Sequence, residues 1–193
     1  TPWRGLNVLL AAMQHVKNPK VTLDVYSSTE VYGKEFHDRE DKNFLELYEQ
    51  ARKLPNVNYI GYKPNNYILD HISNYNIFAY PSIFEETFCI SAAEALSAGL
   101  YCVVTNYGAL YETCSEWPIY VNYEPDHARL AEAFGYAIDQ AAEQLKYPEV
   151  QLHLKNQQTF YKTFYSWKAK AQQWTNFLQG ALNAKQSTKT NLG

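Results

Sequence analysis

The sequence has few cysteines, no long apolar run and no excess of positive charge. Its cysteines, Cys89, Cys102 and Cys114, are odd in number and form no Cys-x-x-Cys pair. A disulfide framework or a zinc site is therefore not indicated, and we expect a reducing, cytoplasmic environment. No apolar stretch approaches the ~18 residues of a transmembrane helix, and we expect no signal peptide. The net charge of -3 argues against nucleic acid as the main partner.

The composition is typical of one globular domain. Apolar residues make up 46% and charged residues 19% of the 193 positions, which is enough apolar material for a sizeable core. We expect residues 1–183 to form this domain and the polar residues 184–193 to form a flexible tail. Because the first residues already resemble a loop that enters a helix, we also expect a further domain upstream of Thr1.

Short apolar segments alternate with amphipathic ones along the chain. Strands are predicted at residues 21–27, 56–62, 77–82, 101–106 and 118–123. Helices are predicted at residues 5–16, 44–54, 65–75, 90–99 and 108–115, and a loop at 28–42. Residues 126–182 are predicted to be helical, with breaks near Pro148 and Ser166. This order predicts an α/β fold with a Rossmann-like, doubly wound parallel sheet flanked by helices and a C-terminal helical extension.

The loop after Ser82 carries the strongest candidate site. Ligands of such sheets bind beyond the C-terminal ends of the strands, where a helix is predicted to begin near residue 90. The free N–H groups of its first turn would form an anion site. These amides belong to Thr87, Phe88, Cys89, Ile90 and Ser91.

Two carboxylates flank this anion site. Glu86 and Glu94 stand eight positions apart, and each could accept hydrogen bonds from neutral hydroxyls. A phosphate flanked by two polyols has the matching layout, and a nucleoside diphosphate sugar is such a molecule. Acidic pairs at this spacing are also common on solvated surfaces, so the residues alone leave both interpretations open.

Other kinds of site receive little support. The charged residues 38–41 do not form an Asp-x-Asp metal site, no glycine-rich phosphate loop occurs, and Ser91 has no evident histidine partner for a nucleophilic triad. The histidines show no ligand spacing; they are His15, His37, His71, His127 and His153. We therefore expect no metal and no cofactor.

The segment from residue 81 to residue 99 resembles the donor-site signature of retaining glycosyltransferases of family 4, which adopt the GT-B fold. The matching residues are Pro81, Ser82, Glu86, Phe88, Glu94, Ala95 and Gly99. The resemblance implies that Glu86 contacts the donor sugar and Glu94 the ribose. The sequence departs from the pattern at Thr87 and Cys89, where the family often has Gly. A side chain is tolerable there if the backbone φ is negative.

Weaker similarities follow in the same order as in the family. Arg4 occupies the position of a Lys that binds the donor phosphates. The segment with Gly61 and Tyr62 resembles the strand and loop that frame the nucleobase, and Gly108 falls behind the donor pocket. Residues 164–174 resemble a closing helix that crosses back to the N-terminal domain in the family.

The resemblance implies the donor-binding, C-terminal domain of a retaining, hexosyltransferase-type enzyme of glycan biosynthesis. Arg4 and Glu86 would be catalytic, and a nucleotide sugar would be the substrate without any metal. An N-terminal acceptor domain would precede this chain, and membrane contact would arise only through that domain. The chain alone would be inactive. A nucleotide-sugar epimerase of similar fold and a non-catalytic nucleotide-sugar-binding module are the alternatives.

Overall fold

The computed structural model describes the backbone of residues 1–190 and the side chains of residues 1–184. The strands are β1 (Leu23–Val25), β2 (Val57–Tyr59), β3 (Ile77–Tyr80), β4 (Tyr101–Thr105) and β5 (Ile119–Val121). The α-helices are α1 (Leu6–Met13), α2 (Lys34–Glu40), α3 (Leu45–Lys53), α4 (Asn65–His71), α5 (Ile90–Ala98), α6 (Leu110–Cys114), α7 (His127–Gln144), α8 (Pro148–Phe164) and α9 (Trp167–Thr190). Short 3-10 helices are η1 (Pro2–Arg4), η2 (Glu30–Tyr32), η3 (Asp41–Phe44) and η4 (Ile72–Asn74).

The strands form parallel sheets, which confirms the predicted α/β class. One sheet pairs β1 with β2, and the other has the order β3-β4-β5. Leu23 is opposite Val57 in the first sheet, and Ile77 is opposite Tyr101 in the second. The sequence predicted one continuous sheet, whereas no ladder joins β1 to β3 in the described part of the chain.

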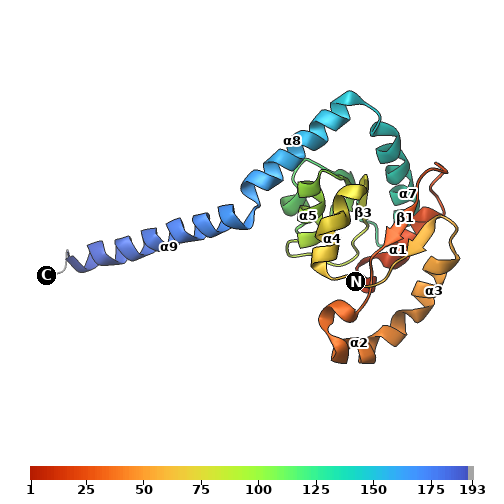
Figure 1. Ribbon diagram of the computed structural model, residues 1–193, viewed down its shortest axis with the longest axis horizontal. Coiled ribbons are helices and arrows are strands. Elements are labelled where there is room, and N and C mark those ends of the chain that lie inside the picture. The colour runs from red at the N-terminus through yellow and green to blue at the C-terminus, as the bar shows by residue number, and fades with distance from the viewer. Residues whose placement is uncertain (191–193) are drawn as a thin grey trace.

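The core lies on both faces of the three-stranded sheet. On one face, Val8 of α1 and Phe134 of α7 pack against Val103 of β4. On the other face, Leu96 of α5 and Tyr161 of α8 pack with Val104. All five residues of β4 are buried, whereas β3, predicted as a buried strand, is only half-buried along its length. Figure 1 shows the helices arranged around the strands.

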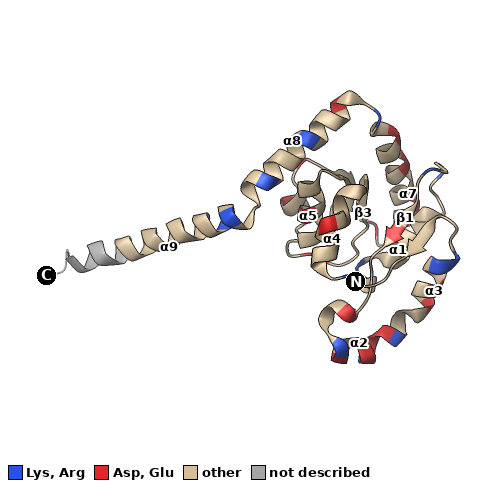
Figure 2. Cartoon of the chain, in the orientation of Figure 1, with Lys and Arg blue, Asp and Glu red and all other residues tan. Residues whose placement is uncertain are grey.

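Residues 28–42 are not the loop that the sequence predicted, because η2 and α2 lie there. Gly33 takes a φ of 89° and is the N-cap residue of α2. Tyr32 and Phe36 pack around Trp3, with ring centroids 5.3 and 5.9 Å from that of Trp3. Charges of both signs are interspersed along α2 and α3 (Figure 2). This short helix, whose one apolar side chain is Phe36, is thus stabilised by an aromatic contact with Trp3.

The C-terminal helices follow the predicted breaks. α8 begins at Pro148, and Ser166 separates it from α9. α9 projects away from the rest of the molecule (Figure 1) and continues to Thr190. Residues 184–190 belong to α9, and residues 191–193 lie outside the described residues; the flexible tail stays a prediction. In the part that the structure describes, no helix is long and apolar enough to cross a membrane.

Candidate functional site

A cleft of about 620 Å³ opens where β1, β2 and β3 end. Five of the residues predicted from the sequence line it: Arg4, Gly61, Tyr62, Ser91 and Glu94. The other predicted residues do not line this cleft and lie in the turn before α5, at its first residue or behind that turn; they are Glu86, Thr87, Phe88, Cys89, Ile90 and Gly108.

A close backbone contact brings Arg4 to the end of β3. Gly5 follows Arg4 with a φ of 112°, and a Cβ at this position would lie 2.0 Å from the carbonyl oxygen of Pro81. Only glycine permits both this φ and this approach. The start of α1 is therefore packed directly on the turn that follows β3, and the Arg4 side chain emerges beside that turn.

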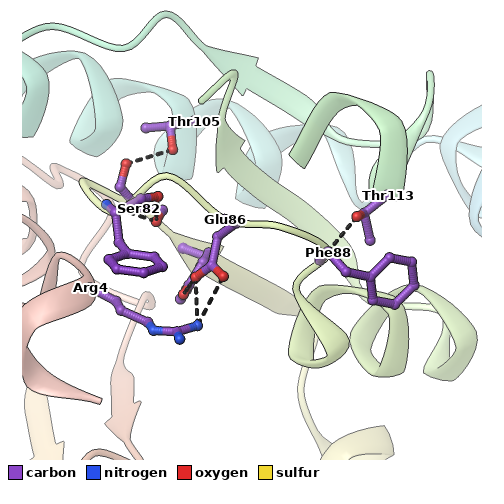
Figure 3. A network of polar contacts seen from close by, with 8 residues as sticks. Arg4, Ser82, Glu86, Phe88, Thr105 and Thr113 are labelled. Atoms are coloured by element: carbon purple, nitrogen blue, oxygen red, sulfur yellow. Dashed lines mark hydrogen bonds and ion pairs between the residues drawn. The ribbon is translucent and has the colours of Figure 1, made fainter. Parts of the chain in front are cut away.

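Arg4, Glu86 and Tyr80 form a compact network. Arg4 Nη1 donates to both carboxylate oxygens of Glu86 at 2.7 and 2.9 Å, and the Tyr80 hydroxyl donates to Oε1 at 2.5 Å. The Glu86 side chain is 4% exposed and that of Arg4 is 29% exposed. The Phe84 ring lies 4.7 Å below the guanidinium. Figure 3 shows Arg4 and Glu86 pointing toward one another.

The electrostatics keep this network charged. Burial would lower the pKa of Arg4, but its interactions with Tyr80 and Glu86 outweigh that effect, so the pKa is raised. Burial, reinforced by Cys89 and Glu86, raises the pKa of the Tyr80 hydroxyl. Tyr80 therefore stays protonated and donates, and Arg4 stays a cation.

The sequence-based prediction assigned Arg4 and Glu86 to separate contacts with the ligand, whereas in the structure the two side chains form an ion pair with each other. With both oxygens engaged, Glu86 orients the guanidinium through Nη1, and Nη2 takes no part in these contacts. Sequence reasoning did not identify Tyr80. The available signal was its place as the last residue of a strand that points to the ligand edge of the sheet.

The turn between β3 and α5 is fixed from behind. The Thr105 hydroxyl donates to the Ser82 carbonyl at 2.9 Å, and the Thr113 hydroxyl donates to the Phe88 carbonyl (Figure 3). A Cβ on Gly108 would lie 2.6 Å from the Glu86 amide nitrogen, and the Ala109 amide donates to the Glu86 carbonyl at 2.7 Å. Gly108 therefore supports the backbone of Glu86 and does not line the cleft.

The start of α5 contains one strained residue. Cys89 precedes the helix with a φ of 66° and a ψ of 79°, so the condition of a negative φ is met at Thr87 but not at Cys89. Left-handed backbone favours Gly. The side chain of Cys89 is buried, and this burial raises the pKa of its thiol to about 11. The thiol therefore stays protonated, and the first-turn amides of α5 follow it without intrahelical partners.

Glu94 of α5 lines the same cleft as Arg4. It is half-buried, and Asn65 Nδ2 donates to its Oε1 at 3.4 Å. Burial raises the pKa of Glu94, and the contact with Asn65 opposes that effect. Asn65 and its neighbour Lys63 also line the cleft and were not identified from the sequence. A weakly paired carboxylate that lines a cleft is available to accept hydrogen bonds from a ligand.

The parallel sheets flanked by helices have the fold of GT-B glycosyltransferase structures. The sequence profile of the family "Glycosyl transferases group 1" matches residues 1–150, and the chain belongs to this family. Among the described residues, no group of three or more His, Cys, Asp or Glu side chains could hold a metal ion.

Solved structures share the fold at low sequence identity. A glycosyltransferase from Rickettsia africae ESF-5 is 18% identical with a TM-score of 0.72, over 94% of this chain and 45% of that one. Sucrose-phosphate synthase from Thermosynechococcus elongatus is 21% identical with a TM-score of 0.69, over 95% and 44%. HepE from Anabaena, solved with UDP-glucose, is 17% identical with a TM-score of 0.65, over 93% and 46%. The chain thus spans less than half of these proteins, and no curated protein matches it.

Proposed function

We propose that this chain is the donor-binding half of a glycosyltransferase that moves a sugar from a nucleoside diphosphate to a hydroxyl acceptor with retention of configuration. The observation that carries the proposal is Arg4, a cation fixed by Glu86 beside the cleft that Glu94 also lines. Membership of the glycosyltransferase family supports it. The presence of UDP-glucose in the HepE structure supports a nucleotide sugar as the donor.

Each side chain has a task in this proposal. Arg4 Nη2 and the first-turn amides of α5 hold the diphosphate, and they stabilise the negative charge that develops as it departs. Glu94 accepts hydrogen bonds from the ribose, and Gly61 and Tyr62 frame the base. Glu86 orients Arg4; it contacts the hexose when one of its present partners is displaced. The positive charge comes from the protein, so no metal is required.

Binding of nucleotides to the chain tests the proposal. Titration calorimetry with UDP, GDP and ADP should detect weak binding of at least one of them. Arg4→Ala should lower its affinity by roughly 10- to 150-fold, which corresponds to the ~1.5–3 kcal/mol of a charge-assisted hydrogen bond. The free nucleoside should bind unchanged. Arg129→Ala is the matched control, because Arg129 also pairs with a carboxylate but lies outside the cleft.

Two results would contradict the proposed site. If Arg4→Ala loses nucleotide affinity and nucleoside affinity equally, Arg4 supports the structure of the site and does not contact the diphosphate. A strict requirement for magnesium would contradict a site without metal.

Catalysis requires a separate assay. The isolated chain should transfer no sugar, and the full-length protein should do so; the anomeric configuration of the product then tests retention. Family membership favours a transferase over an epimerase. Donor binding without any turnover by the full-length protein would favour the non-catalytic module. An upstream acceptor domain, a cytoplasmic location and a role in glycan biosynthesis stay predictions.

A further inference from the structure

Tyr32, the last residue of η2, brings to the cleft an aromatic side chain that the proposed function leaves without a role. It lines the cleft together with Arg4 and is 46% exposed. Among the described residues, none forms a hydrogen bond with its hydroxyl. Tyr32 also contributes to the raised pKa of Arg4, so the two side chains lie within electrostatic reach of each other. A hydroxyl without a partner beside a cation can serve a ligand that contacts both.

Aromatic packing holds the Tyr32 ring next to Arg4. The ring stacks on that of Trp3, with centroids 5.3 Å apart and planes inclined by 29°, and Trp3 directly precedes Arg4 in η1. On α2, the Phe36 ring lies 5.1 Å from the Tyr32 ring. A tyrosine has only two side-chain torsions, so a packed ring also fixes the direction of its hydroxyl. The hydroxyl is thus the one polar side-chain group of this aromatic cluster at the cleft.

A polar network behind η2 fixes the segment that carries Tyr32. The Asp41 carboxylate accepts hydrogen bonds from the Thr29 hydroxyl at 2.7 Å and from the Tyr48 hydroxyl at 3.0 Å. His37 Nδ1 lies 2.6 Å from the Thr29 hydroxyl, and Thr29 is fully buried. Buried polar groups that satisfy one another make a segment rigid. Tyr32 is therefore held in place before any ligand arrives, which lowers the cost of binding.

The chemistry of the pair favours an anionic ligand. Arg4 Nη2 takes no part in the contacts with Glu86, so the cation keeps donors for a ligand. A phenol adds a further donor and does not oppose the positive charge. A sugar hydroxyl could also accept from Tyr32, but a hydrogen bond to an ionised acceptor is about twice as strong as a neutral one. A phosphate oxygen suits the cation and the phenol together.

We propose that Tyr32 is a further ligand-binding residue, whose hydroxyl donates to the diphosphate that Arg4 holds. The two side chains then contact one diphosphate from two segments, η1 and η2. This inference rests on the proposed function, and it assigns a binding role to the segment of residues 28–42.

Tyr32→Phe tests the inference, because it removes the hydroxyl and keeps the ring that packs on Trp3. Titration calorimetry should use the tightest binder of UDP, GDP and ADP, together with the matching nucleoside. We expect the affinity for the diphosphate to fall about tenfold, at the lower end for a hydrogen bond to a charged group because Tyr32 is partly exposed. The nucleoside affinity and the melting temperature should not change.

Tyr111→Phe is the matched control. Tyr111 is also exposed and packs on an aromatic ring, that of Tyr120, but it does not line the cleft. This variant should bind the diphosphate like the wild type, and an equal loss in both variants would contradict a specific role of Tyr32.

Four further results would overturn the inference, and they differ in what they leave standing. Unchanged diphosphate affinity in Tyr32→Phe, with a loss in Arg4→Ala, would remove Tyr32 from the site and leave the proposed function intact. Equal losses for diphosphate and nucleoside would mean that Tyr32 only supports the cleft. A loss for UDP-glucose but not for UDP would place the hydroxyl on the sugar. Failure of the wild-type chain to bind any of the three nucleotides would contradict the proposed function itself, and with it the role of Tyr32.

Discussion

The ion pair between Arg4 and Glu86 leads to a quantitative prediction for the free energy of unfolding. Glu86→Gln keeps the shape of the side chain and removes its charge, so the partly buried Arg4 cation loses its anion. Removing one partner of a buried pair costs about 3–5 kcal/mol, and a hydrogen bond to a charged group contributes about 1.5–3 kcal/mol. Since 29% of the Arg4 side chain is exposed, solvent compensates part of the loss. We expect the free energy of unfolding to fall by about 2–3 kcal/mol.

Glu94→Gln is the matched control for this measurement. It makes the same chemical change eight positions further along the chain, where the carboxylate has only the 3.4 Å contact with Asn65. Its unfolding free energy should equal or slightly exceed that of the wild type. Urea unfolding followed by circular dichroism measures both variants, and in a heating scan the Glu86 variant should melt roughly 4–12 °C lower.

A double-mutant cycle isolates the pair itself. Arg4→Gln should also destabilise the protein, but the variant that combines it with Glu86→Gln should be more stable than the sum of the single changes predicts, by about 1–3 kcal/mol. Additive effects, or a loss below about 0.5 kcal/mol in Glu86→Gln, would refute the claim that Glu86 anchors Arg4.

Two further predictions concern α5. Cys89→Gly should be more stable than Cys89→Ala by about 1 kcal/mol, because both lose the buried thiol but only Gly relieves the φ of 66°; equal unfolding free energies would contradict strain at this residue. Burial raises the pKa of Glu94 above its ordinary value of 4.5, so the folded state holds this proton more tightly and wild-type stability falls as the pH rises through that window. Glu94→Gln should therefore gain stability relative to the wild type at pH 7 and lose this advantage below about pH 4.5. Urea titrations across this range check the sign, and an advantage that persists at low pH would exclude titration of Glu94 as its source.

The sequence predicted the parts of the fold that depend on local pattern. Short apolar or alternating runs located each strand in the described residues, and the apolar run before Gly99 located α5, which ends at Ala98. The helix α2 was not predicted, because all its residues except Phe36 are polar or charged and Phe36 packs on the distant Trp3. The separation into two sheets was not predicted either, because the local sequence pattern does not determine which strands pair with each other.

The candidate site was predicted in composition but not in its contacts. The spacing of Glu86 and Glu94 and the position of Arg4 came from the sequence and its resemblance to a family. The pairing of Arg4 with Glu86 joins residues 82 positions apart, and such a contact arises only when α1 and β3 are packed together. The left-handed φ of Cys89 likewise has no signature in its side chain.

Two contacts far apart in the sequence fix Arg4. Gly5 holds the start of α1 against Pro81, directly after β3, while Glu86 holds the guanidinium from the turn that follows. The first contact fixes the backbone next to Arg4, and the second fixes its side chain. Both partners, Pro81 and Glu86, belong to the segment between β3 and α5, so a shift of that segment would move the backbone and the side chain of Arg4 together. The position of the cation at the ligand edge of the sheet therefore follows from backbone packing as well as from its own ion pair.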